Sequence, residues 1–388
     1  MILVLALAVL VVGVVVLSGA YLPKKYLAPW NKAYSNQFQD IRVKVASHGI
    51  LAASAHNMQP WRATLDQQDQ MSFWLFVDPE GLTPEVDPYA RQIVITQGTF
   101  LEYMRIAGEQ LGYRTSIVLF PNGEFDQDAS TASLKAKPVA KVTLQHAEPK
   151  PSSLYDDMFT PDTSRVAYQE TKLTEDQIRQ LRDLNTFEGI VLEFFQDEAN
   201  LDRLHQFAEA GTRIENDVPG IAALSSKIFR PNEYQKNKYR YGFSLEGGGM
   251  SGPMMYLLEA LLTALPSMNS PEAAKNTAID QTRLAIANTP AYALIITRDN
   301  SRSAQVDAGL LYSRFQLAAA TMGFAMQPMS QVLEEFPQMR EQYEAVHKAY
   351  APQGGTIQML IRVGKPVKQV PRSMRRDVRE IIEDGPVQ

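Results

Sequence analysis

The chain begins with its longest apolar run. This run carries no charged side chain, and only Ser18 and two glycines dilute it. A helix that crosses the hydrocarbon core of a bilayer needs ~20 such residues. The pattern predicts a transmembrane helix over residues 1–22 and a juxtamembrane linker over 23–37, with Tyr26 and Trp30 as anchors at the membrane interface.

The charges that follow this run predict an orientation. Lys24 and Lys25 are the first basic residues of the chain and come directly after the apolar stretch. Positive charge next to a spanning helix stays on the cytoplasmic side. We therefore expect a single-pass membrane protein whose body is cytoplasmic. The alternative is an export signal, since Ser18-Gly19-Ala20 could serve as a cleavage site.

Two helical stretches, at residues 96–112 and 307–323, share one pattern. Thr96 and Asp307 are predicted to cap their N-termini. In each stretch a second glycine comes fourteen positions after the first and is followed by an aromatic residue, as is typical of a helix end. The match predicts an internal repeat, although any two amphipathic helices share part of it.

The repeat predicts an α+β fold of two similar halves. We expect half one over 38–147 and half two over 154–388, packed as an intramolecular pseudo-dimer that could be monomeric. Residues 148–153 have the composition of a linker. Strands are predicted at 71–77, 115–120, 140–144, 292–297 and 356–363.

Composition excludes several kinds of chemistry. The net charge of the 388 residues is −5, which argues against nucleic-acid binding. The chain has no cysteine, so disulfides, thiolate nucleophiles and Cys-ligated metal sites are excluded. The five histidines are scattered and form no H-E-x-x-H pattern, so we expect no metal site.

Residues 54–61, Ser-Ala-His-Asn-Met-Gln-Pro-Trp, are the most informative polar stretch, which we call the amide-rich turn. Short hydroxyl and amide groups suit the edge of a flat heteroaromatic ring that needs both donors and acceptors. The alternative is a polar helix-to-strand turn in which Trp61 anchors the core.

The amide-rich turn resembles the Ser-x-x-Asn-x-Gln-Pro-Trp motif of the nitroreductase superfamily. The segments 91–113 and 307–331 resemble the core helices of that family, and the closest subgroup is the internally duplicated Acg-like flavoproteins. The resemblance implies a sheet flanked by helices, with FMN between the two halves. The residues that it implies at the flavin from half one are Ser54, His56, Asn57 and Gln59.

The resemblance also implies a phosphate-binding side. Thr163-Ser164-Arg165 resembles the Ser/Thr-x-Arg element of the family, although Asp162 stands where the family has a further basic residue. The alternative is a helix cap beside a surface arginine. At the turn of Ser330, the family directs a backbone N–H toward flavin N5.

A basic run near the C-terminus resembles the tail that closes over the phosphate in this family. Arginine pairs with phosphate bidentately, so several converging arginines could offset Asp162. The alternative is a solvated basic run. The residues concerned are Arg372, Arg375 and Arg376.

Each half retains one side of a site, which predicts one FMN per chain. We expect residues 211–252, here called the lid segment, to cover the flavin. Gly247 to Gly252 formally matches G-x-G-x-x-G but lacks a βαβ context, so a flexible hinge is favoured there.

Three hypotheses for function follow. In the first, the protein transfers hydride from NAD(P)H through flavin N5 to a small-molecule acceptor such as a nitro compound or quinone. In the second, it sequesters FMN without catalysis because the lid segment blocks the nicotinamide. In the third, it is a membrane-anchored interaction module that has lost flavin, for which Asp162 is the best support.

Overall fold

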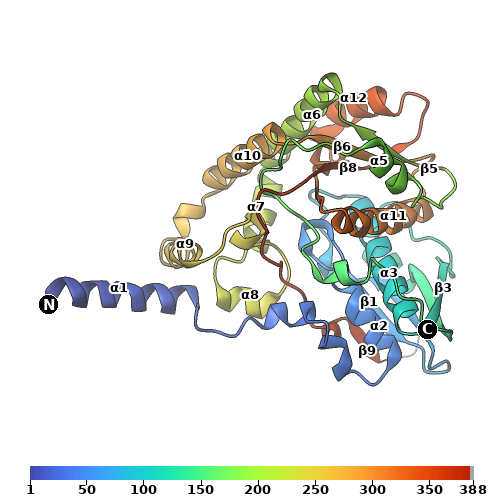
Figure 1. The fold of residues 1–388 in the computed structure, drawn as a ribbon, viewed down its shortest axis with the longest axis horizontal. Helices are drawn as coiled ribbons and strands as arrows, with labels where there is room; N and C mark the ends of the chain where they lie inside the picture. The colour runs from blue at the N-terminus through green and yellow to red at the C-terminus, as the bar shows by residue number, and fades with distance from the viewer. Residues whose placement is uncertain (385–388) are drawn as a thin grey trace.

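Figure 1 shows the computed structural model, which describes residues 1–384. The strands are β1 (Trp61–Leu65), β2 (Ser72–Val77), β3 (Tyr113–Leu119), β4 (Ala140–His146), β5 (Ile190–Phe195), β6 (Ala291–Thr297), β7 (Ala325–Pro328), β8 (Thr356–Gly364) and β9 (Ile382–Asp384). The five strands predicted from the sequence are confirmed, with ends shifted by at most two residues.

The α-helices lie between and around these strands. They are α1 (Ile2–Ser18), α2 (Ile41–Gly49), α3 (Arg91–Gln110), α4 (Thr131–Ala136), α5 (Glu175–Arg182), α6 (Glu198–Asp217), α7 (Pro219–Ile228), α8 (Glu233–Tyr239), α9 (Pro253–Ala264), α10 (Pro271–Ala287), α11 (Arg302–Thr321) and α12 (Arg340–Tyr350). The fold is therefore a mixed α+β fold.

The strands form two sheets with related strand orders. The first has the order β3-β4-β2-β1-β9 and the second the order β5-β6-β8-β7. The strands of each sheet can be numbered along the chain, leaving β9 aside. The first sheet then has the order third-fourth-second-first, and the second sheet has the same order when it is read from β7 to β5. In each sheet one long helix, α3 or α11, connects the second strand to the third. The pairings between these strands are antiparallel, whereas β9 pairs with β1 in parallel.

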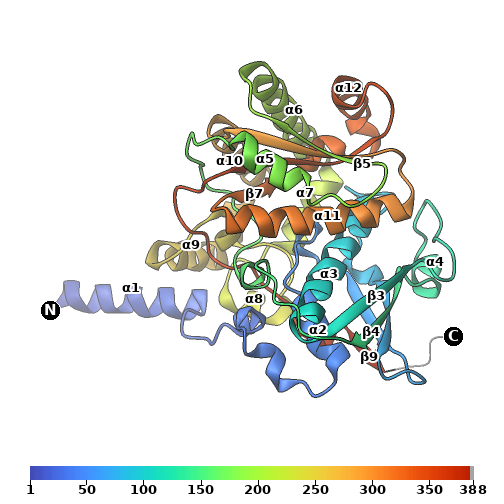
Figure 2. The ribbon, with the colours of Figure 1, turned by 45° about the vertical axis from the view of Figure 1, so that its right-hand side comes forward.

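The helices α3 and α11 pack against each other between the two sheets (Figure 2). A Cβ atom at Gly98 would collide with the carbonyl oxygen of Val306, and one at Gly309 would collide with that of Ile95. Only glycine permits two helix backbones to approach so closely. These two glycines therefore set the closest approach of the central helices.

Both central helices begin one and a half turns earlier than predicted. Thr96 and Asp307 lie inside α3 and α11, so their assignment as N-caps is wrong. The additional residues are held by Arg91 and Arg302, which are buried and donate to backbone carbonyls of distant segments. Such long-range contacts override a local capping preference.

The second sheet is buried on both faces. Ala291, Ala293 and Ile295 of β6 pack against the side of α11, while Tyr292 and Leu294 pack on the opposite face with α6, α10 and α12. Figure 1 shows these three helices beyond the sheet, away from α11. This arrangement places the C-terminal part of α6 close to the middle of the molecule.

The chain returns to the first sheet through a C-terminal tail, residues 365–381. Along the way the indole N–H of Trp30 donates to the carbonyl of Ser373 at 2.8 Å, and the N–H of Arg375 donates to the carbonyl of Tyr26 at 3.0 Å. The tail ends in β9, where Ile382 is in register with Ala63 of β1. Residues from the end of the chain therefore lie beside the amide-rich turn, which directly precedes β1.

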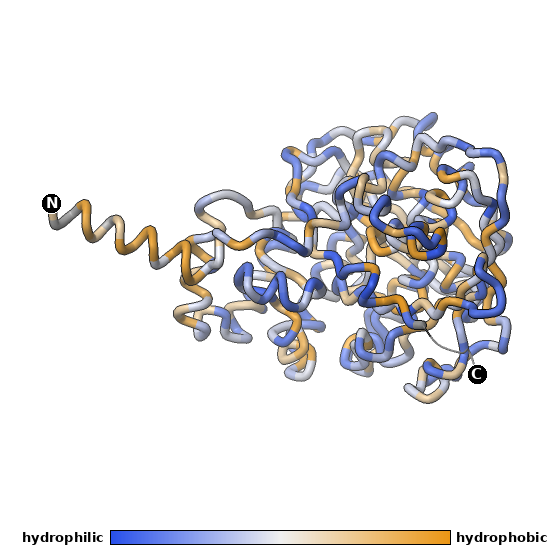
Figure 3. Tube along the Cα trace, turned by 90° about the horizontal axis from the view of Figure 1, so that it is seen from below, coloured by the Kyte–Doolittle hydropathy of each residue, from blue (hydrophilic) through white to orange (hydrophobic). Residues whose placement is uncertain are grey.

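The apolar helix at the N-terminus is shorter than predicted. It ends at Ser18 after 17 residues, where Gly19 adopts a left-handed conformation and its N–H donates to Val15. Such a helix is about 25 Å long, less than the ~30 Å hydrocarbon core. Among residues 1–384, no helix is both long and apolar enough to span a bilayer. The prediction of a transmembrane helix over 1–22 is therefore wrong, and so is the predicted single-pass location with a cytoplasmic body. Figure 3 shows α1 projecting from the body of the protein.

Residues 23–37 pack against the body. They form two 3-10 helices, η1 (Lys25–Trp30) and η2 (Tyr34–Gln37). Tyr26 and Trp30 are 2% and 1% exposed, so their interpretation as membrane-interface anchors is wrong. The side chain of Trp30 instead holds the C-terminal tail, whereas the hydroxyl of Tyr26 donates to Glu233 of α8 at 2.9 Å.

The lid segment is mostly helical. It contains the end of α6, all of α7 and α8, and the 3-10 helix η6 (Leu245–Gly248). Residues 241–245, which precede the glycine-rich stretch, form no strand; a single bridge joins Phe229 to Phe243. The glycine-rich stretch therefore begins within a 3-10 helix and has no nucleotide-binding βαβ context.

Candidate functional site

The amide-rich turn has an unusual backbone. His56, Asn57 and Gln59 have φ angles of 48°, 54° and 51°, in the left-handed region that residues with a Cβ rarely adopt. Trp61 is fully buried and its indole N–H donates to the carbonyl of Thr96 at 3.0 Å. Strain of this kind costs of order 1–3 kcal/mol per residue and clusters at functional sites, because the surrounding structure must maintain it.

The two amide side chains of this turn are bonded to other protein segments. Asn57 Nδ2 donates to the carbonyl of Gly242 at 2.8 Å, and the N–H of Gly242 donates back to the carbonyl of Asn57 at 3.0 Å. Gln59 Nε2 donates to the carbonyl of Arg240 at 2.9 Å, and its Oε1 accepts from the N–H of Arg376 at 2.8 Å. The lid segment and the C-terminal tail therefore both dock on the turn.

Ser54 and His56 form fewer hydrogen bonds to other segments of the protein than Asn57 and Gln59 do. Ser54 Oγ accepts from the N–H of Gln59 at 3.1 Å, which closes the turn. His56 is half-buried, and no hydrogen bond to its ring is formed within residues 1–384. Burial, together with the positive charge of Arg165, lowers the pKa of His56 to about 4. The imidazole is therefore neutral at physiological pH and lies near Arg165.

The basic run of the tail does not converge on one point. Arg375 is fully buried, and its guanidinium pairs with Asp162 at 3.1 Å and lies 4.6 Å from the centre of the Trp30 ring. Arg376 pairs with Asp78 at 3.0 Å. The carboxylate of Asp162 thus compensates the positive charge of the buried Arg375, which accounts for an acidic residue at this position.

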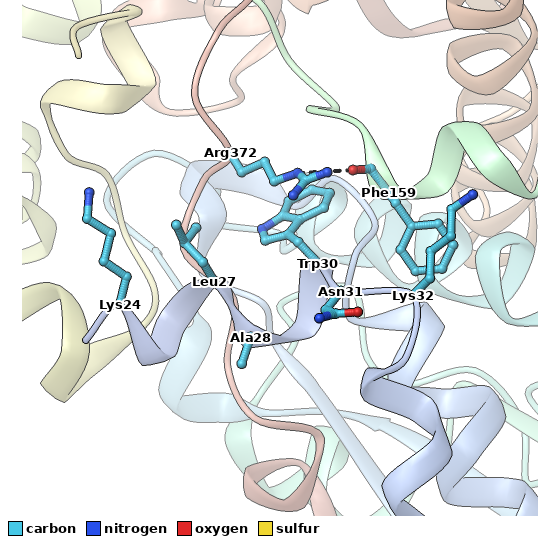
Figure 4. Close-up of a pocket in the computed structure, with 8 residues that line it drawn as sticks. All are labelled: Lys24, Leu27, Ala28, Trp30, Asn31, Lys32, Phe159 and Arg372. Atoms are coloured by element: carbon cyan, nitrogen blue, oxygen red, sulfur yellow. Dashed lines mark hydrogen bonds between the residues drawn. The ribbon is translucent and has the colours of Figure 1, made fainter. Parts of the chain in front are cut away.

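Arg372 faces a different part of the surface (Figure 4). Its Nε donates to the carbonyl of Phe159 at 3.1 Å, and it lies along an open pocket of about 580 Å³. This pocket is lined by Lys24, Leu27, Ala28, Trp30, Asn31, Lys32, Phe159 and Arg372. None of the residues of the amide-rich turn takes part in it.

The Thr163–Arg165 segment runs beside the second sheet. The N–H of Ser164 donates to the carbonyl of Met326 at 2.9 Å, next to β7. Thr163 is partly buried, and no hydrogen bond to its side chain is formed within the described chain. Arg165 is exposed, and the one hydrogen bond of its guanidinium within residues 1–384 goes to the carbonyl of Gly247 at 3.2 Å. Among the described residues, Arg165 thus resembles Arg372 in having a single protein acceptor, whereas Arg375 and Arg376 have several.

Buried polar atoms without a partner surround this segment. Among the described residues they include Ser164 Oγ, Tyr312 OH and Arg375 Nε. Burial and the neighbouring charge of Asp162 raise the pKa of Tyr312, so its hydroxyl remains a donor. Unpartnered buried donors are costly unless something accepts from them. Unpartnered donors of this kind suit an anionic group, although the negative charge of Asp162 would repel that group.

Ser330 lies at the start of the 3-10 helix η8 (Ser330–Leu333). Its hydroxyl accepts from the N–H of Leu360 at 3.2 Å and lies 3.3 Å from the carbonyl of the same residue. These contacts fix η8 against the centre of β8. The side chain of Ser330 is thereby satisfied, which leaves a role for backbone groups alone at this turn.

Sequence reasoning missed one arginine that shapes the site. Arg362 is fully buried in β8, donates to the carbonyls of Ser164 and Val166 at 3.2 and 2.6 Å, and lies 3.8 Å from the centre of the Tyr168 ring. It therefore holds the backbone on both sides of Arg165. A charged residue within a largely apolar predicted strand was the signal that could have identified it.

Comparisons with known proteins give distant similarity. No family model matches the chain. An uncharacterised protein of Mycobacterium tuberculosis is 31% identical over 93 residues, which are 24% of this chain and 26% of that protein, so the chain spans about a quarter of the length of the first curated relatives it matches. A second protein of that organism, named provisionally as an NAD(P)H nitroreductase, is 23% identical over 351 residues, covering 87% of this chain and 90% of that protein.

One of the similar solved structures is the FMN-dependent nitroreductase of Mycobacterium smegmatis in complex with NADPH. It shares 15% sequence identity, covers 54% of this chain and 90% of its own, and has a TM-score of 0.31.

Proposed function

We propose that this protein is an FMN-dependent oxidoreductase of the nitroreductase type. The observation that carries the proposal is the proximity of two segments far apart in sequence. Arg375 donates both to Asn57 Oδ1 and to Asp162 Oδ2, each at 3.1 Å, which joins the amide-rich turn to the residue before Thr163. In keeping with this, the positive charge of Arg165 contributes to the lowered pKa of His56. These two residues belong to the two motifs that a flavin of this family would bridge.

At the phosphate end, Arg165 would supply the accessible positive charge. Ser164 Oγ and Tyr312 OH are buried, unpartnered donors nearby. Hydrogen bonds to a charged group are typically stronger than those between neutral groups. Thr163 can contribute a further hydroxyl.

At the ring end, Ser54, His56, Asn57 and Gln59 would shape the edge of the flavin. A neutral His56 offers hydrogen bonding without a charge. Bound FMN would accept hydride from NAD(P)H at N5 and pass it to an acceptor such as a nitro compound or quinone. The side chain of Ser330 is already hydrogen-bonded to Leu360. The backbone N–H groups of η8 are therefore the protein donors suited to face N5 of the flavin.

The proposal includes two similar halves within one chain, at 38–147 and 154–388. What supports it is the common strand order of the two sheets and a constant offset along the chain. Gly98 approaches Val306, and Gly309 approaches Ile95. The offset is 309 − 98 = 211 and 306 − 95 = 211, so the two helices contact each other through equivalent positions. A single chain would then form the pseudo-dimer.

A second candidate function is FMN sequestration without turnover. It is favoured by the docking of the lid segment on the amide-rich turn through Arg240 and Gly242. A lid that remains docked would keep nicotinamide from the flavin while leaving the flavin bound.

The test is an absorbance spectrum of the purified protein followed by an anaerobic titration with NADPH. An oxidoreductase should show bound flavin that NADPH bleaches, and an added quinone should restore the colour. Bound flavin that NADPH leaves oxidised supports sequestration. A protein that takes up no FMN, even when FMN is added, contradicts both candidates.

A further inference from the structure

Three ionisable side chains from distant segments meet beside the amide-rich turn. They are His56 of the turn, Glu215 of α6 and Glu334, which follows η8. Each offers one potential ligand atom, and these atoms lie within 4.8 Å of one another. Glu215 and Glu334 are 8% and 3% exposed, and His56 is half-buried. The cluster is therefore largely enclosed by protein.

The packing of α6 against η8 creates this cluster. A Cβ atom at Gly211 would lie 2.5 Å from the backbone nitrogen of Val332, so glycine is needed for the close approach. Glu215 comes one helical turn after Gly211 and lies on the same face of α6. Glu334 directly follows the last residue of η8. The contact between helix and turn thus brings the two carboxylates together.

The two carboxylates have no direct counter-charge. Within residues 1–384, no basic side chain forms an ion pair with Glu215 or Glu334. The nearby Arg91 directs its guanidinium to Glu335 and to the carbonyls of Leu333 and Gln358. A buried carboxylate without a counter-charge is strongly disfavoured.

One carboxylate oxygen has no hydrogen-bond partner at all. Glu334 Oε2 is buried and unpaired among the described residues. Burial raises the pKa of Glu215 to about 7 and that of Glu334 above its usual range, which agrees with a site that needs positive charge. The unpaired oxygen is an observation separate from the clustering of acidic residues.

We propose that His56, Glu215 and Glu334 bind one divalent transition-metal cation. A neutral imidazole nitrogen and two carboxylate oxygens form a ligand set that suits Zn²⁺, Mn²⁺ or Fe²⁺ better than Ca²⁺ or Mg²⁺. Metal–ligand distances for such groups are about 2.0–2.2 Å, so the three side chains would close slightly around the ion. Three protein ligands leave at least one coordination position for water or another molecule.

This inference goes beyond the proposed oxidoreductase and does not depend on bound flavin. It is tested by isothermal titration of the full-length, chelator-treated protein with ZnCl₂ and MnCl₂, without added FMN. We expect one cation per chain. Glu215→Gln and Glu334→Gln should each weaken binding at least tenfold, because each removes one charged ligand.

Glu209→Gln is the matched control, since Glu209 lies on the same helix and pairs with Arg213 and Arg283 instead. It should bind the cation as the wild type does. Thermal unfolding with and without Zn²⁺ is the second readout: the wild type should gain stability, and the two ligand variants should gain much less. Circular dichroism confirms that each variant is folded.

Two outcomes would overturn the inference. The first is no saturable binding by the wild type, which would mean that the two carboxylates hold a proton instead of a cation. The second is binding that Glu215→Gln and Glu334→Gln leave unchanged, which would place the ion elsewhere. Because the titration contains no FMN, a failure of the flavin proposal leaves its result unaffected.

Discussion

Within residues 1–384, Arg165 and Arg372 are the exposed arginines of the predicted phosphate-binding set, and each donates to a single carbonyl oxygen, that of Gly247 or of Phe159. Arg375 and Arg376 are paired with aspartates inside the protein. Arg375 and Arg376 therefore have roles that the structure explains without a ligand.

We predict that Arg165→Ala weakens FMN binding. The loss of one charge-assisted contact costs about 1.5–3 kcal/mol, which corresponds to roughly 10- to 150-fold in affinity. Fluorescence titration with FMN measures the effect, and riboflavin, which lacks the phosphate, should bind wild type and variant about equally. Arg372→Ala is the control, since Arg372 lies along another pocket. Equal losses in the two variants would contradict the assignment.

The two central helices depend on two glycines at their crossing. At an exposed helical position, alanine is favoured over glycine by about 1 kcal/mol. At Gly309 that preference is opposed by the carbonyl oxygen of Ile95, which occupies the position a Cβ would need. The helix propensity and the packing therefore predict opposite signs for the change in stability when Gly309 is replaced by alanine.

We predict that the packing effect is the larger of the two, so that Gly309→Ala destabilises the protein. Overpacking at a rigid backbone contact typically costs about 1–3 kcal/mol. Urea unfolding followed by circular dichroism measures it. Gly220→Ala is the control, because the atom nearest to a Cβ there is 3.8 Å away. A stability equal to the wild type would show that the helices can separate without cost.

The lid segment is held together by one buried ammonium group. Lys236 Nζ lies 2.9, 2.6 and 2.6 Å from carboxylate oxygens of Glu233, Glu246 and Glu259, and all four residues are buried. These acidic residues belong to α8, η6 and α9. One lysine thus connects three elements that have little sheet structure to join them.

We predict that Lys236→Met loosens the lid segment. Removing one partner of a buried ion pair costs about 3–5 kcal/mol, because the remaining charges lose their compensation. Hydrogen exchange should show faster amide exchange across residues 233–259 than in the wild type. The exposed Lys238 on the same helix provides the control variant Lys238→Met. Unchanged exchange in Lys236→Met would mean that apolar packing alone holds the segment.

The molecule as a whole has two sheets but one amide-rich turn and one Thr163–Arg165 segment. Residues from the end of the chain complete the first sheet, where β9 pairs with β1. The arrangement brings one copy of each motif to the boundary between the sheets. A second, equivalent site would need motifs that the chain does not contain.

We therefore predict one FMN per chain at saturation. The measurement is the flavin content of protein reconstituted with excess FMN and freed of unbound cofactor, divided by the protein concentration. Light scattering of the same sample should distinguish a monomer from a dimer, so that the ratio refers to a known assembly. Two flavins per chain would contradict the proposed single site.

The residues alone sufficed to predict the α+β class, five of the strands and the two long helices. These features depend on local periodicity, which short-range sterics and burial impose wherever the chain folds. The glycines that end the central helices were identified for the same reason, since Gly112 and Gly323 adopt the left-handed conformation that a helix end favours.

Long-range contacts determined what periodicity could not. The start of α3 depends on Arg91 reaching across to β8 and η8, and the partner of Asp162 comes from Arg375, 213 positions away. The meeting of His56, Glu215 and Glu334 likewise depends on how α6 packs on η8. Sequence patterns describe neighbours along the chain, whereas the charge and partners of a buried group depend on residues that only folding brings near.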